Sequence, residues 1–375
     1  MTLPARYRPL FPGTTEQTYL NSCAHGLQST RARAAAQGFL DQWTRGGDWG
    51  AWWTMTNEAR KAFARFIGAH EDEVALIPNA SAGISAIASA LDFRGERNEV
   101  VTTALDFPSA PYVWNEQAPR GAKHVHLPWN DGLLRVDQVR PHLGPRTKLL
   151  SIPHVASFNG YKLDAKAFTA AAHEAGALAF VDGFQAAGTF PINVKDLDVD
   201  FYVTGTYKWL LGVSGTAFLY VKRELHQELR PTVGGWLAQD DPYGFNPLAP
   251  PAKDARRYQG GGANILGSAV AIEGFNLLNE AGLANVQAHN LRLCDRIMEA
   301  ADARGFQVLT PRAHADRGSI VTFRVPRLTE VLGALAAHNV VVNQRLEGLR
   351  VSPHFYNTEA DVDQLFAVID RTLRA

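Results

Sequence analysis

Short apolar runs alternate with amphipathic segments from about residue 57 to residue 222, and this alternation restricts the fold more than any other feature. Short apolar runs bounded by turn residues are typical of buried strands, and segments with a period of 3.6 are typical of helices. Strands that alternate with helices form a mostly parallel α/β sheet. Seven strands are predicted, at 74–77, 99–103, 124–127, 149–153, 177–181, 201–203 and 216–221.

The pattern changes after residue 230. Pro231–Pro251 is rich in Gly, Pro and Asp and predicts a loop or linker, and a long helix is expected from about Ile265. A second, smaller βαββα pattern follows. We therefore expect a large α/β domain with a mostly parallel seven-stranded sheet over residues 19–246. Residues 1–18 and 247–375 are expected to form a smaller α+β domain.

An acid and a lysine follow two of the predicted strands. Asp182 comes directly after the run 177–181, and Lys208 comes shortly after the run 199–203. A lysine amine forms a Schiff base, the internal aldimine, with the aldehyde of pyridoxal phosphate, and a carboxylate keeps the pyridine nitrogen protonated so that the ring accepts electrons. The two residues, in this order, predict a pyridoxal-phosphate site.

Other residues supply what this cofactor needs. Ala80 and Ser81 lie between a strand and a helix, where free N–H groups and the helix dipole suit a phosphate, although an ordinary N-cap serine fits the same pattern. Phe107 follows a strand at the same edge and can stack on the pyridine ring, although an isolated phenylalanine is more often a core residue. Gln185 is expected to reach the ring hydroxyl, and Tyr207 the phosphate.

These segments resemble the class V aminotransferase family of fold-type I pyridoxal-phosphate enzymes, which includes cysteine desulfurases, kynureninase, isopenicillin N epimerase-like proteins and carbon–sulfur lyases. The closest resemblance is to the carbon–sulfur lyase and epimerase-like members. The similarity covers nearly the whole chain. Beyond the Asp182…Gln185 and Tyr207-Lys208 motifs, it rests on 19–26, 260–265 and 349–358.

The resemblance implies further roles. Arg350 is expected to hold the substrate carboxylate, and Ala24 and His25 to lie at the substrate entrance. Gly262 falls in the segment that resembles a phosphate loop supplied by the second subunit of a homodimer. Phe107 stands where desulfurases carry histidine and kynureninases carry phenylalanine.

The chain departs from the family pattern at several positions. Gly205 stands where desulfurases place a phosphate-binding serine, so either Thr206 compensates or the contact is lost. The segment 261–263 lacks the usual threonine, and Ser157 replaces an asparagine near the ring oxygen. The stretch 340–350 contains no cysteine, although a desulfurase needs a mobile nucleophilic thiol there; neither Cys23 nor Cys294 lies in it.

For some candidate site residues the sequence leaves two interpretations open. His124 and His126 share one strand face, and without a third ligand we favour packing over a metal site. The tryptophans of 43–53 form either a core or dimer contact, which we favour, or a wall of the substrate pocket. His25 has either a catalytic role or none. Arg345 is either a second carboxylate clamp, which we favour, or a surface charge.

Composition and charge indicate which binding partners and which cell compartment to expect. The 37 basic and 37 acidic residues balance, so no nucleic acid or anionic membrane is expected as partner. Two cysteines suit a reducing compartment, and neither a signal peptide nor a spanning segment is recognised, so we expect a cytoplasmic protein.

We expect an enzyme that acts on an amino acid, with Lys208 removing the Cα proton. A lyase that eliminates a group from Cβ by carbon–sulfur cleavage ranks first. Epimerisation or racemisation ranks second and transamination third. A protein that binds pyridoxal phosphate without turnover is the non-enzyme alternative, and intact Lys208, Asp182 and Arg350 argue against it.

Overall fold

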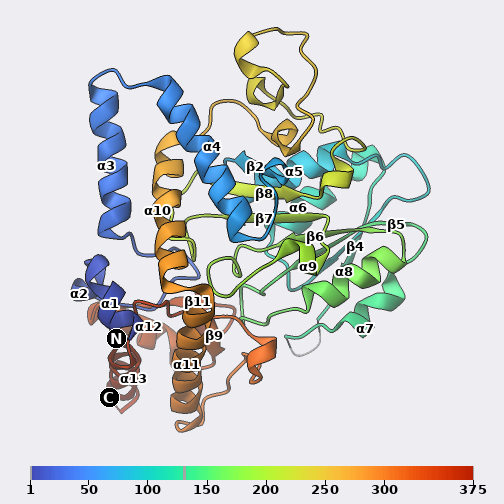
Figure 1. The fold of residues 1–375 in the computed structure, drawn as a ribbon. Helices are drawn as coiled ribbons and strands as arrows, with labels where there is room; N and C mark the ends of the chain where they lie inside the picture. The colour runs from blue at the N-terminus through green and yellow to red at the C-terminus, as the bar shows by residue number, and fades with distance from the viewer. Residues whose placement is uncertain (1, 130–131, 375) are drawn as a thin grey trace.

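The computed structural model describes residues 2–129 and 132–374. A large sheet lies at the centre, and both chain termini lie in a smaller part beside it (Figure 1). The order across the large sheet is β2 (Val74–Ile77), β8 (Ala217–Val221), β7 (Phe201–Gly205), β6 (Leu178–Asp182), β5 (Thr147–Pro153), β3 (Glu99–Thr103) and β4 (Lys123–Leu127).

The sheet is mostly parallel, as predicted. Strands β4, β3, β5, β6 and β7 pair in parallel, whereas β8 is antiparallel to both of its neighbours, β7 and β2. All seven predicted strands occur in this sheet, and their ends differ from the predicted ones by two residues at most.

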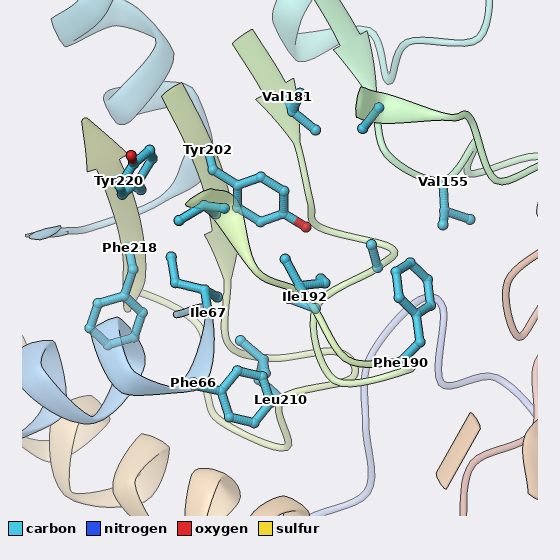
Figure 2. Close-up of a cluster of buried hydrophobic side chains, with 14 of the residues drawn as sticks. Phe66, Ile67, Val155, Val181, Phe190, Ile192, Tyr202, Leu210, Phe218 and Tyr220 are labelled. Carbon is cyan, nitrogen blue, oxygen red and sulfur yellow. The ribbon is translucent and has the colours of Figure 1, made fainter. Parts of the chain in front are cut away.

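Successive residues of each strand face opposite sides of the sheet, so two apolar layers form. On β7, Tyr202 faces the layer that Figure 2 shows in part, with Phe218 of β8 and Phe66 nearby, whereas Phe201 and Val203 face the other layer. Helices α4 (Trp49–Phe66), α8 (Ala165–Glu174) and α10 (Ile265–Ala281) cover the Tyr202 side. Helices α5 (Ala80–Ala90) and α6 (Ser109–Asn115) cover the other side.

The remaining helices are short or lie outside this layer. Helix α3 (Thr30–Thr44) packs with α4 against α10 (Figure 1). Three short helices are α2 (Gly13–Glu16), α7 (Val136–Val139) and α9 (Val194–Leu197).

The smaller part has its own apolar core. An antiparallel sheet of β11 (Asn343–Arg345), β12 (Gly348–Val351) and β9 (Val321–Phe323) packs with α11 (Leu283–Asp302), α12 (Leu328–Ala337) and α13 (Glu359–Arg374). The chain start joins this part through α1 (Leu3–Tyr7) and the parallel pair β1 (Thr18–Tyr19) and β10 (Val340–Val341). Arg8 binds both carboxylate oxygens of Asp361 on α13. The division of the domains at residues 246 and 247 stays a prediction.

The aromatic residues of α3 and α4 lie next to aromatic residues of the loop that follows residue 230. Trp52 is buried, whereas Trp43 and Trp49 are more than half exposed, at 54% and 56%. Trp53 packs edge-to-face on Trp236, 5.1 Å between ring centroids. Tyr243, Phe245 and Leu248 on the same loop are also exposed. None of these side chains lines the candidate site described below. No helix in the described part of the chain is long and apolar enough to cross a membrane.

Candidate active site

The predicted cofactor residues other than Gly262 meet in one cavity at the C-terminal edge of the parallel strands. Ligands bind at this edge in open α/β sheets because loops from several strands converge there. The loops after β2, β3, β5, β6 and β7 all contribute. The cavity is lined by Asn79, Ala80, Ser81, Phe107, Ser109, Pro153, Val155, Ser157, Asp182, Phe184, Gln185, Tyr207 and Lys208.

Lys208 lies among aromatic rings. Its Nζ is 4.3 Å from the ring centroid of Phe184, 5.7 Å from that of Phe107 and 5.8 Å from that of Tyr207. Burial lowers the pKa of Lys208 to about 8, with the charges of Cys23 and Asp182 opposing this effect and two arginines adding to it. A lysine with a lowered pKa is available as a neutral nucleophile or base near neutral pH.

Asp182 ends β6 and is buried in the cavity wall. Its Oδ1 accepts a hydrogen bond from the Phe184 N–H at 2.9 Å. Burial raises the pKa of Asp182, while the Phe184 N–H and the charge of Lys208 oppose the rise. A cation placed against the other carboxylate oxygen would offset this desolvation and keep Asp182 ionised.

The start of α5 forms one end of the cavity. The N-cap of this helix is Asn79, whose Oδ1 accepts from the Ala82 N–H, so the alternative of Ser81 as an ordinary N-cap is wrong. Ser81 instead lies in the first turn. Among the described residues, the N–H groups of Ala80 and Ser81 and the Ser81 hydroxyl make no hydrogen bond and are available to an anion.

Thr206 does not replace the serine that Gly205 lacks. It is fully buried, and its hydroxyl donates to the carbonyl oxygens of Val213 and Thr216 at 2.9 and 3.0 Å. The space beside Gly205 is filled by the Phe184 ring, which a Cβ on residue 205 would overlap. The phosphate contact that a serine at position 205 would make is therefore lost.

Gln185 is oriented by its neighbours. Its Oε1 accepts from the indole N–H of Trp209 at 2.8 Å, and its Nε2 donates to the Cys23 carbonyl oxygen at 3.0 Å. An amide nitrogen carries two hydrogens, so one donor is left for the cavity that Gln185 lines.

Arg350 is buried on β12, next to the cavity. Its Nη1 donates to the carbonyl oxygen of Ser157, a wall residue, and its Nε has no hydrogen-bond partner among the described residues. The loop after β5 also accepts a hydrogen bond from Thr322 of β9, at the Phe158 carbonyl oxygen. This packing brings the arginine of the smaller part to the edge of the large sheet.

Besides Arg345 and Arg350, three predicted residues do not line the wall. The His25 side chain is exposed and packs edge-to-face on Tyr19, 5.5 Å between ring centroids. Ala24 is half-buried in the same turn, and Gly262 is exposed. None of the three lines the cavity in this single chain. Their roles stay predictions, and for Gly262 the predicted contact is with a second subunit.

The histidines at 124 and 126 do share one face of β4, as predicted. One ring nitrogen of each contacts the Thr102 hydroxyl, at 2.7 and 2.8 Å. Within the described ranges, no group of three or more His, Cys, Asp or Glu side chains could hold a metal ion.

The cavity fits pyridoxal phosphate. Unpaired N–H groups at the start of α5 suit the phosphate, Phe107 offers a ring face, and Asp182 offers a carboxylate for a protonated pyridine nitrogen. The Lys208 amine faces the same space.

Sequence reasoning placed Ser157 near the ring oxygen but did not assign a role in the site to Asn79, Ser109, Pro153, Val155 and Phe184. Most of them follow a predicted parallel strand by one to six residues. This position just after a strand end is the sequence feature that could have identified them as site residues. The contact of Phe184 with Gly205 depends on packing between the loop after β6 and the end of β7.

Residues 51–365 match the family model described as Aminotransferase class-V. The uncharacterized aminotransferase YcbU of Bacillus subtilis (strain 168) is 35% identical over 361 residues, covering 96% of this chain and 95% of the relative. Kynureninase of Pseudomonas fluorescens is 27% identical over 342 residues, covering 87% of this chain and 82% of the relative.

Solved structures share the fold. The apo cysteine desulfurase of Thermococcus onnurineus NA1 superposes with a TM-score of 0.90 at 23% identity, over 100% of this chain and 99% of that one. The cystine C-S lyase C-DES, in complex with its product cysteine persulfide, superposes with a TM-score of 0.88 at 20% identity, over 96% of this chain and 99% of that one. The fold is therefore that of fold-type I pyridoxal-phosphate enzymes, as expected.

Proposed function

This chain belongs to the class-V aminotransferase family, whose cofactor is pyridoxal phosphate, and we propose that it is a lyase that cleaves a carbon–sulfur bond at Cβ of an amino acid. The resemblance of the fold to C-DES supports this class of reaction. The finer assignment rests on which acids, bases and nucleophiles surround the cavity.

The proposal assigns one role to each main residue. Lys208 binds the cofactor covalently and, once released, takes the Cα proton. Asp182 keeps the pyridine nitrogen protonated, and Arg350 holds the substrate carboxylate through its unpaired N–H groups. When bound, pyridoxal phosphate supplies an electron sink for the electron pair left on Cα. The Cβ–S bond then breaks with its electron pair on sulfur, and water converts the released enamine into a keto acid and ammonia.

The side chains of the cavity wall are the basis for preferring a lyase to a desulfurase or an epimerase. Lys208 is the lysine base there, and Phe107 is apolar. No cysteine lies on the wall, and the segment 340–350 contains none, so a persulfide-forming nucleophile has no place on that segment. Cys294 is buried in the core of the smaller part, where burial raises the pKa of its thiol to about 12. Epimerisation would need a second proton donor, and the candidate His25 is exposed, packs on Tyr19 and does not line the wall.

A product assay tests the proposal. The purified holoenzyme is given S-substituted cysteines, and keto acid, ammonia, inverted amino acid and protein persulfide are measured together. Stoichiometric keto acid and ammonia are expected, with an unchanged rate in the Cys23→Ala/Cys294→Ala variant. A persulfidated cysteine, inversion at Cα without keto acid, or amino transfer without ammonia would each reject the lyase assignment.

We also propose a homodimer. Trp49, Tyr243 and Phe245 are exposed and are connected by ring contacts through Trp53 and Trp236. Leu248 on the same loop is also exposed, and Gly262 is exposed on a loop that the family resemblance assigns to a partner's phosphate site. Sedimentation of the unmodified protein and of the Trp49→Ser/Phe245→Ser variant tests this. A monomeric unmodified protein with full cofactor occupancy contradicts it.

A further inference from the structure

Arg345 has a guanidinium that the proposed reaction does not use. It lies at the end of β11, opposite Gly348 across the β11–β12 hairpin. Its guanidinium carbon is 5.8 Å from the ring centroid of Phe107, the same ring that lies 5.7 Å from Lys208 Nζ. Phe107 lines the cavity and is 43% exposed, so the guanidinium lies at the mouth of the site.

The charge of Arg345 is not neutralised inside the described part of the chain. It forms no ion pair and no side-chain hydrogen bond with any described residue. The nearest acid in the sequence, Glu347, pairs instead with Arg324 at 3.4 Å. Arg345 lies beside Phe107, and Arg350 binds the carbonyl oxygen of the wall residue Ser157, so both charges lie near the cavity. Both lower the pKa of Lys208.

The other charges of the site leave Arg345 without a counterion. In the proposed function, Asp182 would pair with the pyridine nitrogen, the start of α5 would bind the cofactor phosphate, and Arg350 would bind the α-carboxylate of the substrate. The second acid near the cavity, Asp106, accepts two hydrogen bonds from Thr103, and burial raises its pKa to about 8. Burial therefore favours the neutral form of Asp106 and reduces the charge that it can set against Arg345.

We propose that Arg345 binds a second anionic group, located on the side chain of the substrate, so that this enzyme selects amino acids whose side chain ends in a carboxylate. The inference rests on the proposed function, because it takes Arg350 as the site of the α-carboxylate. A half-exposed guanidinium that faces a ring and has no acid beside it can form a forked pair with a carboxylate at the mouth of the site.

Two isosteric substrate pairs test the inference. The first is S-carboxymethylcysteine and its amide, S-carbamoylmethylcysteine, compared by kcat/KM for keto acid formation. The second is glutamate and glutamine, compared by the change in cofactor absorbance when they bind to the holoenzyme. In each pair the two compounds differ by one charge and hardly in size. We expect a preference for the acid of about tenfold to a hundredfold, since hydrogen bonds to charged groups contribute that much.

Three variants locate the effect. In Arg345→Gln the ratio of acid to amide should fall to near one in both pairs. Arg345→Lys keeps the charge without the fork and should retain part of the preference. Glu347→Gln perturbs the same turn and should leave the ratio within about twofold of the unmodified enzyme.

The two pairs separate failure of this inference from failure of the lyase proposal. A binding preference for glutamate that Arg345→Gln removes, in an enzyme that eliminates nothing, rejects the lyase and keeps the role of Arg345. Equal use of acid and amide by the unmodified enzyme rejects the role of Arg345. So does an Arg345→Gln variant that keeps the preference but loses cofactor affinity, because the guanidinium then binds the phosphate.

Discussion

The ring of Phe184 fills the space that a side chain on Gly205 would need. A Cβ built on Gly205 would lie 2.6 Å from Phe184 Cε2 and closer still to Cζ, well inside any real contact. The same ring lies 4.3 Å from Lys208 Nζ. The absence of a side chain at position 205 is therefore the condition for an aromatic wall beside the lysine.

This relationship predicts coupling between the two positions. Gly205→Ser should destabilise the protein by about 1–3 kcal/mol, because the added atoms overpack the site. Phe184→Ala should remove the overlap, so the double variant should be more stable than the sum of the two single changes predicts, by about 1 kcal/mol or more. Thermal unfolding of the apoproteins and cofactor dissociation of the holoproteins measure the cycle. Additive effects would show that the ring moves aside freely.

Lys208→Ala should remove the covalent attachment of the cofactor and nearly all turnover, since the attachment point and the base are the same amine. Absorbance spectra and a borohydride trapping experiment, read by mass spectrometry, check the attachment. A Lys208→Ala variant that still traps the cofactor covalently would assign the attachment to another lysine. Folding is controlled by comparing the thermal unfolding of the variant and unmodified apoproteins.

Capture of the cofactor by the apoprotein should become faster as the pH rises. The neutral amine is the reactive form, and the pKa of Lys208 is lowered from 10.5 to about 8, so the capture rate should rise with pH and level off above about 8. At pH 7 the neutral fraction is about 10%, against about 0.03% for an ordinary lysine. The rate is followed by absorbance, with N-acetyl-lysine as the free-amine control. If the capture rate had the same pH midpoint for the protein as for N-acetyl-lysine, Lys208 would have the pKa of a solvated lysine.

Arg350→Lys should lower kcat/KM by an effect of about 2 kcal/mol or more, chiefly through KM, because a lysine cannot form the two parallel hydrogen bonds of a guanidinium. The buried and unpaired Nε of Arg350 is the structural basis. Steady-state kinetics on the amino acid and on its decarboxylated amine give the result. Equal activity of the unmodified enzyme on both compounds would remove Arg350 from carboxylate binding.

Local sequence patterns were sufficient for the strands and for the placement of Asp182 and Lys208 at one edge of the sheet. The apolar runs that predict β6 and β7 are uninterrupted, since both faces of a central parallel strand are buried. Asp182 and Lys208 follow those runs closely, so the convergence of strand ends places both at one edge. Such inferences need only the period of the chain and the chemistry of two side chains.

The tertiary structure decided which polar side chains remain free and which spaces are filled. Thr206 bonds to two carbonyl oxygens of its own loop, Phe184 fills the space at Gly205, and His25 turns toward Tyr19. Arg345 comes to Phe107 although 238 positions separate them in the sequence. Contacts of this kind arise from competition between hydrogen-bond partners and from close packing across distant elements, and the period of a sequence carries no information about either.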